Sequence, residues 1–306
     1  MQCSLIIDSC CDLPADVVDR EDIFLLKFPY IMSDGEHADD LYRSTTAHEF
    51  FESMRKGEEP STAQLGVPAL REAYEWAYSR GLPAVYLSFS SGLSGSYDVA
   101  MLVKGQFAEE HPDFELHVVD TRLASVAEAL LVYEAIRQYD KGLSAEELVR
   151  WAEEARFFVD AQFMVDDLES LRRGGRIPAS VAFAGAKLDV KPLLGIGPDG
   201  KLGLTGVARG RKKGIKQLAD YYAKRHTDDR PGSCVVLGNA DCPKDAAKLR
   251  ELLGKQDEGL LFLESSIGPV IGTHVGPGMI AVVFWGPDKR EDVSIADRIA
   301  RRVKNS

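Results

Sequence analysis

The first half of the chain alternates short apolar runs with longer stretches whose apolar residues recur at helical spacing. Apolar runs of strand length occupy residues 3–7, 23–28, 84–88 and 115–119. Helical patterns lie at residues 46–55, 68–80, 96–107, 125–139 and 145–158. Because parallel strands need crossover connections, usually helices, this alternation predicts a parallel sheet with helices on both faces.

The pattern changes after about residue 160, where strands become more frequent than helices. Strand-like runs occupy residues 161–165, 201–207, 233–237, 260–264 and 279–285. The Gly-Pro-Asp-Gly sequence at 197–200 is a strong turn signal and predicts antiparallel pairing nearby. We therefore predict an α/β protein of two domains. Residues 1–160 would form a three-layer α/β/α parallel-sheet domain, and residues 161–306 a two-layer domain with a mixed sheet.

The strand at 84–88 runs directly into a serine- and glycine-rich segment, 89–97, which opens a helix. Unpaired backbone N–H groups and hydroxyls converge at such a turn, and the helix dipole favours negative charge. This segment, with Ser94 at its centre, therefore predicts an anion site. A phosphate loop is disfavoured because no lysine follows Gly95.

Three other hydroxyl residues occupy similar positions along the first half. Ser9 and Thr121 follow strands, and Thr62 precedes a helix. Because the carboxyl ends of parallel strands meet at one edge of a sheet, we expect Ser9, Thr62, Ser94 and Thr121 to share one rim. Taken singly, a residue of this kind is more often a helix cap or turn residue, but four on one edge favour a shared site.

A second glycine- and proline-rich segment, 267–278, surrounds the polar pair Thr273-His274. Such a backbone can approach a ligand closely, and an imidazole is a suitable partner for an anion. The alternative is a structural histidine in a turn.

The basic segment 209–216 contains five cations and stands where a helix should begin. Cations oppose the helix dipole at that end, so a functional reason is expected, such as contact with an acidic partner surface. The alternative is an ordinary solvated face. The candidate partner-binding residues are Arg209, Arg211, Lys212 and Lys213.

Composition excludes several classes of function. The chain has 306 residues, 45% of them hydrophobic, and a net charge of −11, which argues against a nucleic-acid binder. It lacks an apolar run long enough for a membrane span and a basic start typical of a secretory signal. Five scattered cysteines indicate neither a disulfide framework nor a metal site, so a cytoplasmic protein without a metal is expected.

The main enzymatic alternative is a serine hydrolase or esterase. Ser94 lies in a sequence close to the Gly-x-Ser-x-Gly nucleophile elbow, and Asp241 and His274 follow in the order of a catalytic triad. Against this, Ser96 replaces the final glycine of the elbow, and no His-Gly-Gly oxyanion segment appears upstream. A regulator that binds a non-lipid small molecule is the third interpretation.

Several motifs together resemble the DegV family, the fatty-acid-binding proteins that serve bacterial fatty acid kinase. Residues 7–13 resemble its Asp-Ser-x-x-Asp-Leu opening, and residues 88–97 its Ser-x-x-Leu-Ser-Gly-Thr-Tyr stretch. Residues 165–177 are similar to the signature that ends in Gly-Gly-Arg-Ile, and 268–278 nearly repeat the C-terminal motif. The motifs occur in the family's order and span nearly the whole chain.

The resemblance implies that a long-chain fatty acid lies between the two domains. It implies that Thr62, Ser94 with the Gly95 amide, and His274 hold the carboxylate, and that the basic segment meets a DAK-type fatty acid kinase. That kinase would transfer phosphate from ATP, so this chain would be a carrier with no catalytic residue and no cofactor. Further rim candidates are Ser9, Gln64, Thr121 and Thr273. The family's Thr-Ser-Gln-Pro-Ser loop is altered here at Ala63, Leu65 and Gly66.

Overall fold

The computed structural model describes residues 3–177, 189–227 and 233–291. Its first sheet is entirely parallel, in the order β2-β1-β6-β7. The strands are β1 (Ser4–Asp8), β2 (Ile23–Leu26), β6 (Ala84–Ser88) and β7 (Leu116–Asp120). All residues of β1 and β6 are buried, as expected for strands covered on both faces.

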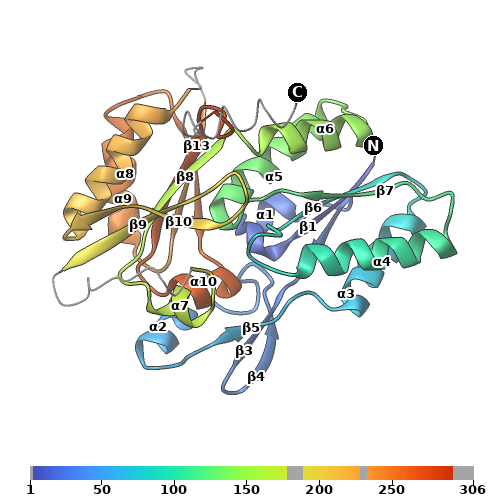
Figure 1. The fold of residues 1–306 in the computed structure, drawn as a ribbon, viewed down its shortest axis with the longest axis horizontal. Helices are drawn as coiled ribbons and strands as arrows, with labels where there is room; N and C mark the ends of the chain where they lie inside the picture. Colours follow the sequence, from blue (N-terminus) through green and yellow to red (C-terminus); the bar gives the residue numbers. More distant parts are fainter. Residues whose placement is uncertain (1–2, 178–188, 228–232, 292–306) are drawn as a thin grey trace, which may run out of the picture.

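Helices cover both faces of this sheet (Figure 1). On one face, α3 (Val67–Ser79) packs on α4 (Ser96–Glu110), and on the other α5 (Ser125–Asp140) packs on α6 (Ala145–Ala155). The start of α6 is fixed by a capping box between Ser144 and Glu147. The predicted three-layer parallel-sheet arrangement is confirmed.

The second sheet is mixed and has the order β10-β9-β8-β13-β11-β12. Only β11 and β12 pair in parallel, and the other neighbours are antiparallel. Its strands are β8 (Val159–Met164), β9 (Val190–Ile196), β10 (Leu202–Arg209), β11 (Cys234–Asn239), β12 (Leu261–Ser266) and β13 (Ile280–Trp285). The helices α8 (Arg211–Arg225) and α9 (Pro243–Gly254) pack on each other and cover one face. The predicted mixed α/β architecture is therefore confirmed for this half.

The two sheets share α5. This helix belongs to the first half of the chain, but it also packs against β8, β11 and β13 of the second sheet. One continuous apolar core consequently runs from β1 through α5 to β13. Below this core in Figure 1, two short helices, α7 (Glu169–Arg173) and α10 (Pro269–Val275), pack together.

A small antiparallel sheet in the first half was not predicted. It contains β3 (Pro29–Met32), β4 (Gly35–Ala38) and β5 (Ser61–Thr62), with α2 (Ala47–Arg55) inserted between β4 and β5. Short exposed strands carry little apolar pattern, which is why sequence periodicity misses them. Strand β9 was missed as well, and Pro192 interrupts its strand-like composition. The remaining short helices are η1 (Ser9–Cys11) and α1 (Ala15–Val18).

Candidate functional site

An apolar cavity lies between the two sheets and has one polar end. It encloses about 770 Å³ that protein atoms do not fill, including its open mouth. Most of its lining is aliphatic or aromatic and comes from β8, β13, the start of α5 and the loop after β6. Thr62, Ser94, Arg176 and His274 supply the polar end.

Thr62 and His274 meet at this end although they lie 212 residues apart in the chain. Thr62 is in β5, where it pairs with Tyr30 of β3, and His274 is in the last turn of α10. The distance between Thr62 Oγ1 and His274 Nε2 is 2.9 Å, which is a hydrogen bond. The unpredicted small sheet thus places the threonine, and a helix within the glycine-rich segment places the histidine.

His274 is electrically neutral at neutral pH. Burial, reinforced by the positive charges of Arg176 and Arg173, lowers its pKa to about 4. Its Nδ1 atom is buried and has no hydrogen-bond partner among the described residues. A Cβ placed on Gly174 would lie 2.1 Å from Nδ1, so the imidazole occupies the space that a side chain at position 174 would need.

The start of α10, the helix that carries His274, is held by a buried aspartate from the first half. The Gly268 amide donates to Asp12 Oδ1 at 2.9 Å. The Ser125 hydroxyl donates to the other oxygen of the same carboxyl group. Burial raises the pKa of Asp12 well above its ordinary value. Sequence reasoning missed this role, although Asp12 lies within the quoted opening motif.

Ser94 is the central polar residue of the loop between β6 and α4. Its Oγ lies 3.0 Å from Ser96 Oγ and accepts from the Ser96 amide at 3.2 Å. Ser96 Oγ in turn accepts from the Leu65 amide at 3.0 Å. Gly95 forms the N-cap of α4, and a Cβ there would lie 2.7 Å from Gln64 Oε1. The altered loop at 62–66 therefore packs directly on the serine segment.

Arg176 is a lining residue that sequence reasoning did not assign to the ligand site. Its Nε donates to the Leu93 carbonyl at 3.1 Å, and its Nη1 donates to the Gly174 carbonyl. Burial lowers its pKa. Because Leu93 belongs to the first half and Gly174 to the second, this side chain ties the two halves together at the polar end. The Gly-Gly-Arg-Ile signature, which contains Arg176, was the sequence feature that could have indicated this role.

The other rim candidates lie outside the cavity lining. Ser9 is buried and accepts from the Phe28 amide at 3.0 Å. Thr121 donates to the Ser88 carbonyl at 2.8 Å, and Thr273 to the Pro269 carbonyl at 2.8 Å. Each of these hydroxyls satisfies backbone groups at a strand end or within a helix, as the cap and turn interpretation expects. Gln64 is exposed and does not line the cavity.

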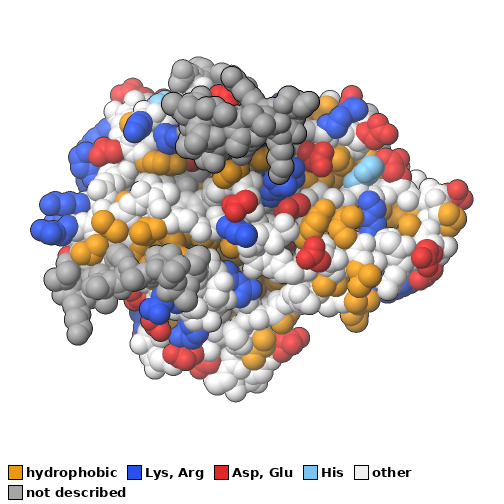
Figure 2. Space-filling view, viewed as in Figure 1, with side chains coloured by type: hydrophobic (Ala, Val, Ile, Leu, Met, Phe, Trp, Pro, Cys, Tyr) orange, Lys and Arg blue, Asp and Glu red, His pale blue; other side chains and the backbone are white. Residues whose placement is uncertain are grey.

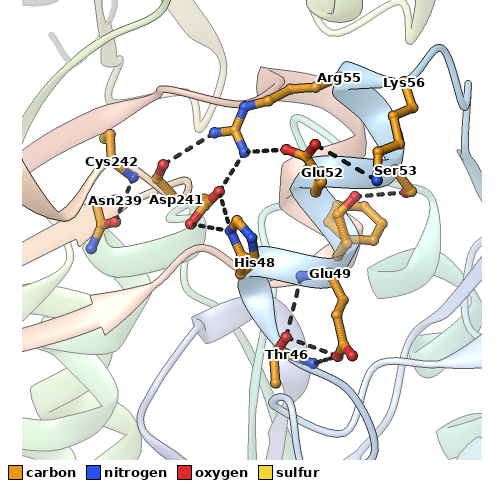
Figure 3. Close-up of polar contacts among 11 residues, drawn as sticks. Thr46, His48, Glu49, Glu52, Ser53, Arg55, Lys56, Asn239, Asp241 and Cys242 are labelled. Carbon is orange, nitrogen blue, oxygen red and sulfur yellow. Dashed lines mark hydrogen bonds and ion pairs between the residues drawn. The ribbon is translucent and has the colours of Figure 1, made fainter.

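The geometry does not form a serine-hydrolase triad. Figure 3 shows Asp241 pointing at α2, where its carboxylate contacts Arg55 and lies 3.1 Å from His48 Nδ1. His274 is bonded to Thr62, and Ser94 is bonded to Ser96. Asp241 is held at α2 and His274 at Thr62, so these residues are not linked as a Ser-His-Asp triad, and the hydrolase alternative is not supported.

The basic segment divides into two kinds of residue. Arg211 is used internally, because Nη1 lies 3.1 Å from Asp166 Oδ1, Nη2 donates to the Gly278 carbonyl at 2.6 Å, and Nε contacts Asp245. Arg209, Lys212 and Lys213 are exposed. Figure 2 shows Lys and Arg side chains gathered along the edge of the molecule where α8 lies in Figure 1.

The described residues lack two features that would indicate other functions. They contain no helix long and apolar enough to cross a membrane. They also contain no cluster of three or more histidine, cysteine or acidic side chains placed to hold a metal ion. All five cysteines are free.

An apolar cavity with one polar end, enclosed between two α/β sheets, is typical of proteins that bind amphipathic small molecules. The chain belongs to the DegV family: the model described as "Uncharacterised protein, DegV family" matches residues 2–286. A DegV domain-containing protein of Clostridium perfringens is 35% identical over 282 residues, which cover 92% of this chain and 97% of the relative.

Solved structures of the family have the same fold. The Thermus thermophilus DegV family protein, described as binding fatty acid, has a TM-score of 0.80 and 28% identity over 94% of this chain and 100% of its own. DegV of Bacillus subtilis, described as a fatty acid binding protein, has a TM-score of 0.77 and 26% identity over 94% of this chain and 100% of its own.

Proposed function

We propose that this chain binds a long-chain fatty acid in the cavity between the two sheets. The carboxylate would lie against Thr62, Ser94, the Gly95 amide and His274, and the tail would run along β8 and β13. The observation that carries the proposal is the lining of the cavity, which is predominantly apolar and has Thr62, Ser94, Arg176 and His274 at one end. The fatty-acid binding described for the Thermus and Bacillus relatives supports the same ligand class.

The hydrogen bonds around Ser94 favour donation toward a carboxylate. Ser96 Oγ already accepts from the Leu65 amide, so its own hydrogen is available for Ser94. Ser94 Oγ then accepts from the Ser96 hydroxyl and amide, which leaves the Ser94 hydrogen for the ligand. With neutral His274 donating from Nε2 to Thr62 Oγ1, the Thr62 hydroxyl hydrogen is left for the ligand as a second donor. The donors closest to the ligand would therefore carry no charge of their own.

Arg176 modifies this arrangement. Its guanidinium is the one charged group among the described lining residues, and two of its nitrogens donate to backbone carbonyls. We assign it to attracting and orienting the carboxylate from behind Ser94. The carboxylate oxygens then remain accessible at the mouth for a reaction on another protein.

We further propose that the bound carboxylate is presented to a separate ATP-dependent fatty acid kinase of DAK type in the cytoplasm, which forms the acyl phosphate. The exposed cations Arg209, Lys212 and Lys213 supply a surface for an acidic partner. This chain then contributes binding and orientation, and the kinase contributes the phosphoryl-transfer chemistry. No cofactor other than the bound lipid is required of it.

The decisive experiment is organic extraction of the purified chain followed by mass spectrometry, together with titration by palmitate and oleate. We expect co-purified fatty acid and saturable uptake of the added acids. Absence of both would refute the proposal. With the cognate kinase, Ser94→Ala and Thr62→Ala should lower acyl-phosphate formation while the fold persists. A fluorophosphonate probe should leave Ser94 unlabelled, since labelling would restore the hydrolase alternative.

A further inference from the structure

A second cavity lies directly behind the apolar end of the first. It encloses about 1230 Å³ of unfilled space, part of it open to solvent, and is lined by the β9–β10 hairpin and residues of β8 and α8. The two cavities share three lining residues, Ala161, Ile196 and Leu202. These three side chains therefore form a wall one residue thick between the cavities.

The position of this wall is set by strand register. The cavity floor runs along β13 through Met279, Ala281 and Val283, away from α10 and His274. Ala281 pairs with Phe163, and Val283 pairs with Ala161. Four residues of strand span roughly 13–14 Å, so Ala161 stands at the end far from the polar groups. Ile196 pairs with Leu202 and completes the wall.

The environment changes sharply across the wall. On the near side, Val283 and Phe163 are apolar, and the neighbouring lining residue Gln162 carries no charge and donates from Nε2 to Thr205 Oγ1 at 3.0 Å. On the far side, the second cavity contains Asp160 and Arg225, whose Oδ2 and Nε atoms lie 2.6 Å apart, and the nearby Lys289. A methylene that extended past the wall would lie in the second cavity, next to charged side chains and solvent, and would no longer be in contact with the apolar lining of the first.

The wall is held in place by the first half of the chain. The turn between β9 and β10 packs on the loop after β6, where Ser90 Oγ donates to the Gly200 carbonyl at 2.9 Å. A Cβ on Gly92 would lie 2.8 Å from the Asp199 carbonyl oxygen, so the two backbones are in close contact. The hairpin that carries Ile196 and Leu202 is thus docked against the loop that also presents Ser94.

We propose that Ala161, Ile196 and Leu202 set the length of acyl chain that this protein accepts, by closing the apolar cavity at a fixed distance from the polar end. This inference rests on the proposed function. Each methylene buried before the wall should improve affinity about fourfold, and each methylene beyond it should add little. The unaltered protein should therefore show affinity that rises with chain length and then reaches a plateau.

The test is a series of saturated acids from about twelve to twenty-two carbons, with dissociation constants measured on the full chain. Leu202→Ala should move the plateau to longer acids and raise the preference for an acid two carbons beyond the wild-type plateau by about tenfold. Ala161→Leu should move the plateau to shorter acids. Leu204→Ala is the matched control, because Leu204 is on the same strand, is 43% exposed and lines only the second cavity.

The outcomes separate the two proposals. If the unaltered chain binds acids but Leu202→Ala and Leu204→Ala give the same length profile, the wall does not select length. If the unaltered chain binds no acid of any length, the proposed function itself fails. Thermal melts of each variant show whether it is folded. Ile196→Ala, which also removes side-chain volume from the wall, should move the plateau to longer acids and replaces Ala161→Leu as the second test if that variant does not fold.

Discussion

The polar end of the cavity is assembled from distant segments, whereas its apolar end is formed by neighbouring strands. Thr62, Ser94 and His274 come from β5, the loop before α4, and α10, and each is fixed by a hydrogen bond to a named partner. At the other end, Val283 and Ala161 are directly paired in one sheet. The polar end depends on single contacts between distant segments, and the apolar end mainly on strand register.

This difference indicates what each end contributes to ligand binding: affinity or the position of the carboxylate. A tail of roughly 14 methylenes buried in the apolar part supplies on the order of 11 kcal/mol before the costs of association. A single hydrogen bond at the polar end contributes about 1 kcal/mol. Affinity should therefore come mainly from the apolar end. The polar end should mainly determine the position of the carboxylate.

The largest expected effect comes from filling the space that His274 occupies. Gly174→Ala places a methyl group where Nδ1 now lies, so the imidazole must move and its contact with Thr62 is lost. We expect a loss of about 1–3 kcal/mol in unfolding free energy, and weaker ligand binding. Denaturant titration measures the first effect and fatty-acid titration the second.

The control for this substitution is Gly105→Ala, because a Cβ at position 105 of α4 would meet nothing within 4 Å. It should raise stability by about 0.5–1 kcal/mol through helix propensity and leave binding unchanged. Equal binding by Gly174→Ala and the wild type would mean that the imidazole position does not matter to the polar end.

The second prediction concerns Arg211, which lies outside the cavity and holds the segment next to α10 in place. Arg211 connects α8 to Gly278, which lies between α10 and β13, and it also contacts two aspartates. Arg211→Ala should lower the unfolding free energy by about 1–3 kcal/mol, since charged hydrogen bonds are lost and Asp245 loses its arginine, whereas Asp166 keeps its ion pair with Lys191. Chemical denaturation gives the value directly.

Lys212→Ala is the matched variant, because its side chain is exposed and is the next residue in α8. It should change stability by no more than about 0.5 kcal/mol. If Lys212→Glu slows acyl-phosphate formation without weakening lipid binding, the exposed cations serve the partner. Similar destabilisation by both alanine variants would remove the distinction between a structural arginine and a surface lysine.

The third prediction compares two substitutions: a hydroxyl is replaced by a methyl group at the polar end, and a methyl group by a hydroxyl at the apolar end. Thr62→Val should reduce affinity by about tenfold or less, because one hydrogen bond is lost, and should reduce acyl-phosphate formation more strongly. Val283→Thr, at a fully buried position of the apolar end, should instead weaken binding without affecting the turnover of bound ligand. A kinetic assay at saturating fatty acid separates the two effects, and the reverse pattern would contradict the separate contributions of the two ends.

The apolar end and the polar end also differ in how far the sequence predicted them. The bounds of strands β8 and β13 were predicted within a few residues, because buried strands have runs of mostly apolar residues in the sequence. Ser94 was located from its strand, turn and helix context. Thr62 and His274 were identified only in part, since their meeting depends on a two-residue strand and on a short helix inside a segment expected to be irregular.

Two features had no periodic signal at all. Arg176 lines the cavity and donates to the Leu93 and Gly174 carbonyls, and Asp12 reaches α10 from the first half of the chain. Both residues lie in sequence motifs, but their contacts with Leu93 and Gly268 join distant parts of the chain, and only the fold shows them. Ser9 and Thr121, which were predicted at the rim, form hydrogen bonds with backbone groups, as the cap and turn interpretation expects.

The smallest predicted effect is a dependence of stability on pH that arises at the polar end alone. The pKa of His274 is lowered to about 4 in the folded chain, from an ordinary value of 6.5. The unfolded chain therefore takes up a proton below pH 6.5 that the folded chain refuses until about pH 4. Stability due to this residue is present above pH 6.5 and is lost as the pH falls through that interval.

Comparison with His274→Gln isolates this dependence. Burial raises the pKa of both Asp8 and Asp39 to about 7, and these carboxyls give a slope of the opposite sign, but they are present in both proteins and cancel in the difference. Allowing for the partial exposure of the imidazole, the wild type should lose about 1 kcal/mol relative to the variant between pH 7 and pH 5. Urea titrations at several pH values measure this difference. A flat difference curve would mean that His274 titrates normally, so that the imidazole bonded to Thr62 is charged, and not neutral, below pH 6.5.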